Sequence, residues 1–281
     1  MRNKYLMKLT AKTKTLDLSS PQIMGILNFT PDSFSDSGQF FQLDKALVQV
    51  ETMLQQGASI IDIGGESTRP MAEEVTLEQE LERVIPLVEA VRQRFDCWIS
   101  VDTSKARVMQ EAANAGMDLI NDIRALREPN ALQTAVQLGL PVCIMHMQGQ
   151  PRTMQLNPHY DDVVADVLKF MQQRTEQCLT SGIKKENLLW DPGFGFGKSV
   201  QHNYRLLQQL SVFCEQGYPV LAGISRKSMI GAVLDKTVEQ RMVGSVSAAL
   251  IAAMKGACIL RVHDVGETAD ALKIWQATVN A

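Results

Sequence analysis

Short apolar runs alternate with longer amphipathic stretches along almost the whole chain. The apolar runs have the length of buried strands and are bounded by polar or glycine-rich turns, whereas the stretches between them have the periodicity of helices. The predicted strands are Gln22–Asn28, Ser59–Gly65, Cys97–Ser104, Leu119–Ile123, Pro141–Met147, Asn187–Gly193, Pro219–Ser225 and Cys258–Asp264. The predicted helices include Leu43–Gln56, Leu77–Arg94, Lys105–Ala115 and Asp161–Ser181, and Gly57, Gly116, Gly139 and Gly182 mark helix ends.

Eight strand–helix units without a linker or a low-complexity segment predict an α/β protein built as a single (β/α)8 TIM barrel. The chain has 281 residues, of which 45% are hydrophobic, enough for one large core. A doubly wound open sheet is the alternative architecture. The count of eight, and the absence of a Gly-x-Gly-x-x-Gly motif after the first strand, favour the barrel. Residues 1–20 are predicted to be an N-terminal extension, a short lysine-bearing tail, and residues 21–281 the barrel domain.

Charge and composition narrow the classes of partner. The net charge of −3 and pI near 5.9 give no reason to expect a nucleic acid or a membrane surface. The apolar runs are shorter than the roughly 20 residues that span a bilayer. The N-terminus lacks the apolar segment of a signal peptide, and the five cysteines stand singly without a Cys-x-x-Cys spacing. We therefore expect a cytoplasmic protein with neither a zinc site nor a redox pair.

Nearly every predicted strand ends in a polar or charged residue that could bind a ligand or take part in catalysis. In a TIM barrel the active site lies at the C-terminal ends of the strands. The residues there are Asn28, Gly64-Gly65-Glu66, Asp102-Thr103-Ser104, Asn121-Asp122, His146, Asp191, Ser225-Arg226-Lys227-Ser228 and Arg261-Val262-His263-Asp264. Core packing alone does not place a carboxylate, an amide or a cation at so many strand ends, so we expect one shared site.

The predicted site has two parts. Asp102, Asn121, Asp191 and Lys227 are expected to converge on a deep pocket for a planar heterocycle with amino and carbonyl groups, such as a pterin or a purine. The alternative is a buried Asp–Lys pair that only stabilises the core. The last two strands supply cations, which suit a phosphorylated or pyrophosphorylated ligand, although a solvated basic patch is the alternative. These cations are Arg226, Lys227, Arg261 and His263.

Three loops complete the predicted site. The stretch Asp191–Lys198 alternates glycine and phenylalanine, as expected of a backbone that approaches a flat ligand while aromatic side chains flank it. The polar segments 30–38 and 66–70 follow the first two strands and are predicted to act as lids. Within the first of them, Asp32 and Asp36 are candidates to stabilise a developing cation or to help hold a magnesium ion.

Taken together, these motifs closely resemble those of the dihydropteroate synthases of bacterial folate biosynthesis, a family of pterin-binding barrels and sulfonamide targets. The motifs that carry the resemblance are Met24-Gly-Ile-Leu-Asn-Phe-Thr-Pro-Asp-Ser-Phe-Ser-Asp36, Asp62-Ile-Gly-Gly-Glu-Ser-Thr-Arg-Pro70, Ser100-Val-Asp-Thr-Ser104, Ile120-Asn-Asp-Ile123, Met145-His-Met-Gln-Gly149, Asp191-Pro-Gly-Phe-Gly-Phe-Gly-Lys198, Ser225-Arg-Lys-Ser228 and Arg261-Val-His-Asp264. They run in order from about residue 22 to the C-terminus, one at each predicted strand end.

The resemblance implies a transferase that joins p-aminobenzoate to the methylene carbon of 6-hydroxymethyl-7,8-dihydropterin pyrophosphate and releases pyrophosphate. It implies catalytic roles for Asp36, Asp102, Lys227 and Arg261. It places the pterin at Asp102, Asn121, Asp191 and Lys227, the pyrophosphate at Asn28, Thr68, Arg261 and His263, and p-aminobenzoate at Phe34, Thr68, Pro70, Phe196, Lys227 and Ser228. It further implies Mg²⁺ as cofactor, with Asn28 as a metal ligand near Asp36, and a homodimer formed through the late helices Val243–Met254 and Thr268–Thr278.

The resemblance leaves two alternatives and one departure. A methyltetrahydrofolate-dependent methyltransferase shares the barrel and the pterin-binding acids, but it does not need the first lid or the cations of the last strands. A catalytically silent pterin-binding subunit does not need Asn28, Asp102, Lys227 and Arg261 intact. Met71 stands where the family often carries glycine, and a positive φ at that position would strain the second lid.

Overall fold

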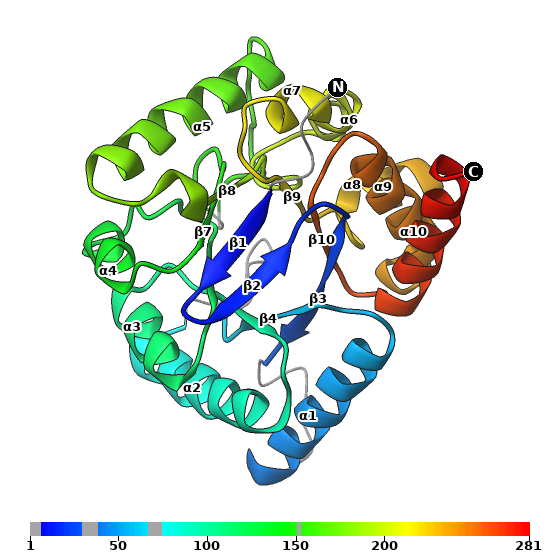
Figure 1. Ribbon diagram of the computed structural model, residues 1–281. Helices are drawn as coiled ribbons and strands as arrows, with labels where there is room; N and C mark the ends of the chain where they lie inside the picture. The colour runs from blue at the N-terminus through cyan, green and yellow to red at the C-terminus, as the bar shows by residue number, and fades with distance from the viewer. Residues whose placement is uncertain (1–6, 30–38, 67–74, 151–152) are drawn as a thin grey trace.

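Eight parallel strands close into a barrel with the helices around it, as the sequence predicted (Figure 1). The structure is a computed structural model that describes residues 7–29, 39–66, 75–150 and 153–281. The barrel strands are β3 (Gln22–Asn28), β4 (Ile60–Gly64), β5 (Trp98–Asp102), β6 (Leu119–Asp122), β7 (Val142–Met145), β8 (Leu188–Asp191), β9 (Leu221–Ala222) and β10 (Ile259–Val262). A parallel bridge between Trp190 and Val220 joins β8 to β9 and closes the ring.

The helices lie outside this ring, where their apolar faces cover the strands (Figure 1). They are α1 (Gln39–Gln55), α2 (Leu77–Arg94), α3 (Ala106–Ala115), α4 (Ala131–Leu138), α5 (Val163–Thr180), α6 (Val200–Gln208), α7 (Leu210–Cys214), α8 (Ser228–Leu234), α9 (Met242–Met254) and α10 (Val265–Val279). Short 3-10 turns, η3 (Lys185–Asn187) and η4 (Val238–Gln240), precede β8 and α9. The four glycines predicted to end helices all have positive φ angles.

The strand register aligns several of the predicted site residues. Asn28 pairs with Gly64, Gly64 pairs with Asp102, and Asp102 pairs with Asn121 on successive strands. Because all of these residues stand at or beside the C-terminal ends of parallel strands, they lie at one rim of the barrel. The hydrogen-bonding register therefore brings Asn28, Asp102 and Asn121 side by side.

A short hairpin covers the opposite end of the barrel (Figure 1). It pairs β1 (Lys8–Ala11) with β2 (Lys14–Asp17), and its Leu9 and Leu16 are buried in the main core. Lys12 Nζ donates to the carbonyl of Ala113 at 2.9 Å, so a lysine of the hairpin binds a main-chain oxygen at the end of α3. From the sequence, this region was predicted to be a basic tail. In the structure it is a hairpin that closes one end of the barrel.

None of the helices described by the structure is both long and apolar enough to cross a membrane.

Candidate active site

An arginine–carboxylate network occupies the middle of the rim. Arg261, on β10, donates from Nε to Asp62 Oδ2 at 2.6 Å and from Nη2 to Asp102 Oδ2 at 2.9 Å. The Asp62 side chain has no exposed surface, and those of Asp102 and Arg261 are 8% and 19% exposed. Burial alone lowers the pKa of the guanidinium, but the two carboxylates outweigh it and hold that pKa above its usual value.

Neighbouring polar groups complete this network. Ser100 Oγ donates to Asp62 Oδ1 at 2.6 Å, and Asn121 Nδ2 approaches Asp62 Oδ2 at 3.3 Å. Burial raises the pKa of Asp102 to about 7, with Arg261 opposing the shift and Asp62 reinforcing it. Asp102 is therefore a carboxylate whose charge responds to its surroundings near neutral pH.

A second acid–base pair lies at the ends of β8 and β9, the strands that follow β10 around the ring. Asp191 is buried at the end of β8 and accepts the Gly193 N–H at 2.7 Å through Oδ1. Burial raises the pKa of Asp191, and the nearby Lys227 ammonium opposes the shift. Burial also lowers the pKa of Lys227 to about 8, with Asp191 acting in the opposite direction. Asp191 and Lys227 are thus near enough for the charge of each to act on the pKa of the other.

Lys227 also contacts the glycine-rich loop. Its Nζ donates to the carbonyl oxygen of Phe194 and lies 4.6 Å from the centroid of the Phe196 ring. A cation at that distance from an aromatic ring is attracted to the negative face of the ring. Lys227 therefore joins the pterin side of the predicted site to the aromatic wall predicted for p-aminobenzoate.

Two glycines let the loop pack this closely. Gly193 has a φ of +73°, and a Cβ built on it would stand 1.8 Å from the carbonyl oxygen of His146. Gly195 has a φ of +78°, and a Cβ there would stand 2.9 Å from Lys227 Cδ. Any other residue at 193 would collide with backbone that cannot move aside, so glycine is required there.

A buried lysine holds the loop from inside. Lys198 is 3% exposed, and its Nζ donates to Gly193 O at 2.8 Å and Phe196 O at 3.0 Å and contacts His146 Nδ1 at 2.9 Å. Burial and the Lys198 charge lower the pKa of His146 to about 2, so its ring is neutral and accepts this hydrogen bond. Phe194 is fully buried. Lys198, Phe194 and His146 form the scaffold of the loop.

The cations at the end of the barrel have distinct partners. His263 Nδ1 lies 2.9 Å from Ser225 Oγ, and the His263 N–H donates to the same oxygen at 3.2 Å. Arg226 instead turns to Asp264, with Nε donating to Oδ2 at 3.1 Å. Of the cations predicted for an anionic ligand, Arg226 pairs with Asp264, outside the network, whereas Arg261 pairs with the network acids Asp62 and Asp102.

Asn28 lies half-buried at the end of β3, beside the network. A Cβ on Gly64 would stand 3.6 Å from Asn28 Oδ1 and 3.7 Å from Asp102 Cβ. The missing side chain at Gly64 therefore keeps space between the amide and the carboxylate.

Comparison with known proteins decides the family. Residues 24–263 match the family described as pterin binding enzyme. The dihydropteroate synthase of Haemophilus influenzae is 76% identical over 275 residues, which cover 98% of this chain and 100% of that protein. Among solved structures, the Yersinia pestis dihydropteroate synthase with a sulfonamide drug has a TM-score of 0.94 and 58% identity, covering 98% of this chain and 100% of that one. A Xanthomonas albilineans dihydropteroate synthase in complex with 7,8-dihydropteroate has a TM-score of 0.89 and 45% identity, covering 98% and 99%.

The chain belongs to the dihydropteroate synthase family. The predicted resemblance is thereby confirmed, and the chain is placed among the transferases. The family assignment does not by itself test the individual site residues.

Several residues that the resemblance assigned fall outside the described part of the dihydropteroate synthase fold. These are Phe34 and Asp36 in the segment after β3, with Asp32, and Thr68 and Pro70 in the segment after β4, with Met71. Their predicted roles stay predictions. Ser228 is described as the exposed first residue of α8, directly after Lys227.

Asp62 was not predicted from the sequence to be a site residue of this member of the dihydropteroate synthase family. Asp62 stands inside the apolar strand Ile60-Ile61-Asp62-Ile63 and not at its end. A charged residue in a buried strand must be paired, because an isolated buried carboxylate is strongly unfavourable. That position within a buried strand is a signal from which the need for a polar or cationic partner could have been predicted, although not which residue supplies it.

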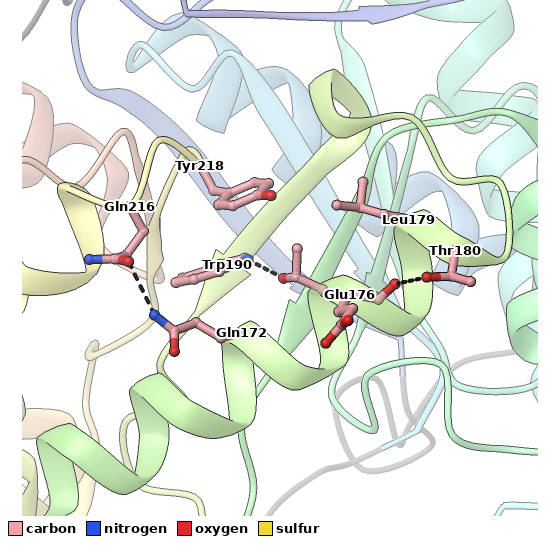
Figure 2. A pocket seen from close by; sticks show the side chains of 8 residues that line it. Gln172, Glu176, Leu179, Thr180, Trp190, Gln216 and Tyr218 are labelled. Atoms are coloured by element: carbon pink, nitrogen blue, oxygen red, sulfur yellow. Dashed lines mark hydrogen bonds between the residues drawn. The ribbon is translucent and has the colours of Figure 1, made fainter.

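A groove of about 410 Å³ on the outer wall of the barrel lies apart from this site (Figure 2). There Trp190 stacks on Tyr218, with ring centroids 4.9 Å apart, and donates from Nε1 to Thr175 Oγ1 at 2.8 Å. Successive side chains of a strand point to opposite faces, so Trp190 faces the helices and Asp191 faces the interior. The groove belongs to the packing of α5 against the barrel.

Proposed function

We propose that the chain condenses 6-hydroxymethyl-7,8-dihydropterin pyrophosphate with p-aminobenzoate to give 7,8-dihydropteroate and pyrophosphate. The observation that carries this proposal is the meeting of two buried carboxylate sites, around Arg261 and around Lys227, at one rim of the barrel. A single cation paired with a carboxylate is common in protein cores. Two such sites, joined to a glycine-rich loop with an aromatic wall, fit a ligand with a heterocycle and an anionic group.

The acids recognise the pterin. A carboxylate accepts two parallel N–H donors, which is the pattern that the amino group and ring N–H of a pterin present. Asp191 is suited to this because Gly193 N–H and the Lys227 charge stabilise its ionised form. Asp102 and Asn121, paired in register on β5 and β6, lie along the same rim and bind the remaining polar edge.

The pyrophosphate binds among Arg261, His263 and Asn28. An arginine side chain carries five N–H donors in a planar fork. Within the described residues, Asp62 and Asp102 use two of them, which leaves donors for phosphate oxygens. Thr68 is assigned to the same ligand by the family resemblance.

The reaction proceeds by departure of the leaving group before attack. The methylene C–O bond breaks with its electron pair going to pyrophosphate, and the resulting methylene cation is delocalised into the pterin ring. Arg261 stabilises the charge on the departing pyrophosphate, and the Asp102 carboxylate stabilises the cation. The neutral amine of p-aminobenzoate, held against Phe196 and Lys227, then attacks the methylene carbon and loses a proton.

We propose that magnesium assists pyrophosphate departure. No group of three His, Cys, Asp or Glu side chains in the described part of the chain is arranged to hold a metal ion. Magnesium commonly takes only one or two protein ligands together with substrate phosphates, and Asn28 offers an amide oxygen at the rim. When bound, the ion would neutralise charge on the pyrophosphate. The resemblance places the ion near Asp36 as well.

We propose further that two copies associate through α9 and α10. Val243 and Met254 of α9 and Ile274 of α10 are 65%, 60% and 71% exposed, and together they give this side of the molecule a set of apolar side chains. Such apolar surface is typical of interfaces between identical chains. A cytoplasmic location is proposed as well, supported by five buried cysteines that form no disulfide with one another, as suits a reducing compartment.

The test is direct. The purified protein is incubated with dihydropterin pyrophosphate, p-aminobenzoate and magnesium, and pyrophosphate release and dihydropteroate formation are both measured. Equal amounts of both products are expected, and no release of pyrophosphate would overturn the proposal. Methyl transfer from methyltetrahydrofolate, measured in parallel, would identify the methyltransferase alternative. Asp191→Ala and Lys227→Ala are expected to abolish turnover, whereas unchanged turnover would refute the site assignment.

A further inference from the structure

Arg226 has a left-handed backbone in the loop between β9 and α8. Its φ angle is +59°, which is unfavourable for a residue with a side chain because Cβ approaches the carbonyl oxygen that follows it. Such a residue persists only where surrounding groups hold it, and strained residues of this kind cluster at functional sites. Lys227, which directly follows Arg226, is the lysine that contacts the glycine-rich loop. The contacts that hold Arg226 therefore bear on the active site.

Two residues at the start of α9 hold the backbone of Arg226 from both sides. The Arg226 N–H donates to Ser245 Oγ at 2.8 Å, and the Arg226 carbonyl accepts a hydrogen bond from Arg241 Nη1 at 3.0 Å. The single O–H of Ser245 donates to the Arg241 carbonyl at 2.7 Å, so its oxygen acts towards Arg226 as an acceptor. Ser245 is buried, so this hydrogen bond to Arg226 is shielded from water.

The side chain of Arg226 and the peptide unit that follows it are also held. The guanidinium donates from Nε to Asp264 Oδ2 at 3.1 Å and from Nη2 to Asp264 Oδ1. The Lys227 N–H, in the next peptide unit, donates to the Ile224 carbonyl at 3.2 Å. That peptide unit is therefore held at its N–H by Ile224 and at its oxygen by Arg241. Its orientation sets the direction in which the Lys227 side chain leaves the backbone.

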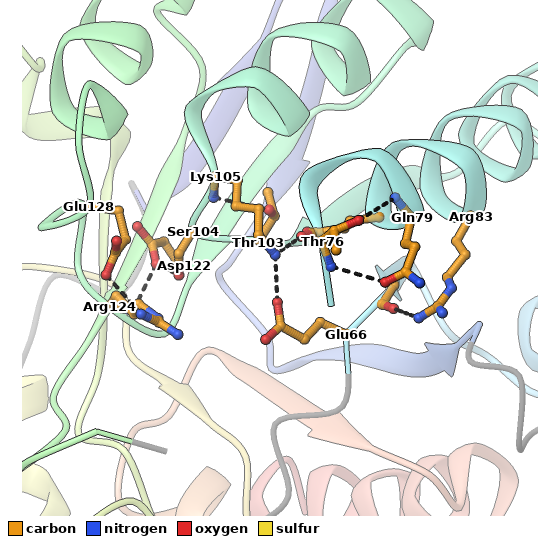
Figure 3. Close-up of polar contacts among 12 residues, drawn as sticks. Glu66, Thr76, Gln79, Arg83, Thr103, Ser104, Lys105, Asp122, Arg124 and Glu128 are labelled. Carbon is orange, nitrogen blue, oxygen red and sulfur yellow. Dashed lines mark hydrogen bonds and ion pairs between the residues drawn. The ribbon is translucent and has the colours of Figure 1, made fainter. Parts of the chain in front are cut away.

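The turn after β6 is built in the same way. Ala125 and Leu126 have φ angles of +55° and +58°, and Arg174 of α5 donates to the carbonyl oxygens of both. Asp122 accepts the Arg124 N–H at 2.7 Å through Oδ1 (Figure 3). At the ends of both β6 and β9, an arginine side chain from outside the ring thus stabilises a left-handed turn at the active-site rim.

The position of the Lys227 ammonium determines its contacts and its charge. Its Nζ lies 4.6 Å from the centroid of the Phe196 ring. Burial lowers the pKa of Lys227 to about 8. Asp191 and Asp102 act to raise that pKa, and Arg261 acts to lower it further. Because burial and charge interactions both depend on position, a movement of the preceding residue is expected to alter this pKa together with the ligand contacts.

We propose that Ser245 and Arg241 are positioning residues for Lys227. By keeping the residue before it left-handed, they direct its ammonium to the rim of the barrel. The inference rests on the proposed function, which places Lys227 at both the pterin and p-aminobenzoate. Ser245 is in the first turn of α9 and Arg241 directly precedes that helix, so both act through Arg226 and not on the substrates themselves.

Two serines of α9 give a matched test. Ser245 and Ser247 both donate to the carbonyl four residues earlier, at 2.7 and 2.8 Å, but Ser245 also accepts the Arg226 N–H, whereas Ser247 is exposed. Ser245→Ala is expected to raise the Kd for dihydropterin pyrophosphate and the KM for p-aminobenzoate about tenfold each, since small misplacements at a site have effects of this order. Ser247→Ala should leave both within about twofold. Ser245→Thr keeps the hydroxyl and is expected to restore most of the affinity.

A second measurement needs no substrate. NMR titration of isotope-labelled lysine side chains gives the pKa of Lys227, with its signal assigned by its loss in Lys227→Met. In Ser245→Ala and in Arg241→Met this pKa is expected to rise from about 8 towards the value of about 10.4 for an exposed lysine, because a relaxed turn exposes the ammonium. Arg241→Lys keeps a donor for the Arg226 carbonyl and is expected to give a smaller rise.

These results separate positioning from stability. If Ser245 served stability alone, Ser245→Ala would lower the melting temperature but leave the Kd and the pKa of Lys227 unchanged, and the proposal would be overturned. Equal effects of Ser245→Ala and Ser247→Ala would overturn it as well. Absence of turnover in the unsubstituted protein would instead refute the proposed function, while the pKa comparison would still decide whether Lys227 is positioned from α9.

Discussion

Arg261 Nε lies 2.6 Å from Asp62 Oδ2, although the two residues are 199 positions apart in the chain. Arg261 also pairs with Asp102, so one guanidinium compensates two carboxylates that are almost inaccessible to water. The same cation is proposed to bind pyrophosphate. The stability of the fold and the proposed binding of pyrophosphate therefore both depend on Arg261. Substitutions can separate these two effects.

Arg261→Met leaves Asp62 and Asp102 buried without their counter-charge. Removing one partner of a buried pair costs about 3–5 kcal/mol, so the free energy of unfolding is expected to fall by about that amount. Adding Asp62→Asn to this variant is expected to recover part of the stability without restoring pyrophosphate binding. Denaturant unfolding measures the first effect and calorimetry the second. Unchanged stability in Arg261→Met would contradict the network.

The pH dependence of the free energy of unfolding should reveal the lowered pKa of Lys227. Its pKa in the folded protein is lowered to about 8, whereas a lysine in an unfolded chain has a pKa near 10.4. Between these values the unfolded state binds the proton and the folded state does not, so the free energy of unfolding rises with pH across this window. The difference between the parent protein and Lys227→Met is expected to follow that rise. Parallel curves for the two proteins would show that the pKa of Lys227 is not lowered.

The affinity for dihydropterin pyrophosphate should change with pH in the opposite direction to the free energy of unfolding. Above about pH 8 the Lys227 ammonium loses its proton, so Asp191 loses a favourable neighbouring charge and the pterin site keeps only a weaker, neutral N–H donor. The affinity for dihydropterin pyrophosphate is therefore expected to fall as pH rises through this value. Titration calorimetry over this range measures it. A flat affinity profile would refute a charged Lys227 in the pterin site.

Substitution of glycines distinguishes a steric requirement from a conformational one. Gly193 and Gly217 both have positive φ angles, but a Cβ on Gly217 would meet nothing within 4 Å. Gly217→Ala is expected to lower the free energy of unfolding by about 1–2 kcal/mol, the cost of a left-handed residue. Gly193→Ala should cost clearly more and abolish pterin binding, because its Cβ would collide with the His146 carbonyl. Similar losses in both variants would show that the loop can move aside.

The hairpin under the barrel should contribute to stability. Leu9 has no exposed surface and belongs to the main core, whereas the adjacent Thr10 is exposed. Leu9→Ala is expected to lower the free energy of unfolding by about 2–5 kcal/mol, and Thr10→Ala should change it little. Thermal or denaturant unfolding provides the comparison. Equal effects at both positions would mean that the hairpin does not pack as described.

The proposed dimer can be tested with two matched valines. Val243 on α9 and Val48 on α1 are 65% and 62% exposed. Val243→Glu is expected to shift the protein towards monomer in sedimentation velocity, because a charge in an apolar interface is costly. Val48→Glu serves as the control and should leave the sedimentation coefficient unchanged. If the unsubstituted protein is a monomer in solution, the dimer proposal is refuted.

The barrel was predictable because its strands are continuous apolar runs, as buried parallel strands are. Every predicted strand was found, and most of the observed strands are shorter than predicted. The reduction is greatest at Pro219–Ser225, where only Leu221–Ala222 remains as β9. The hairpin was not predictable in the same way, since each of its strands has only four residues and Lys8 and Lys14 begin them.

Within the site, the sequence revealed strand-end residues but not their partners. Asp102, Asn121, Asp191, Lys227 and Arg261 could be predicted to share one rim because parallel strands place their ends together, while their roles toward the substrates stay predictions. The pairing of Arg261 with Asp62 depends on the stagger between β10 and β4, which local sequence does not encode. The support of Arg226 by Ser245 and Arg241 was missed for a similar reason, since only the packing of α9 against the chain that follows β9 brings these residues together.

β10 enters the ring between β3 and β9, so the last strand of the described residues lies next to the first barrel strand. During synthesis, Asp62 and Asp102 emerge from the ribosome long before Arg261 does. Until then both acids must stay hydrated or protonated, and the interior of the barrel cannot be sealed around them. The strand that completes the ring therefore also carries the guanidinium that pairs with both acids, so closure of the barrel and neutralisation of its buried charges come from the same segment of chain.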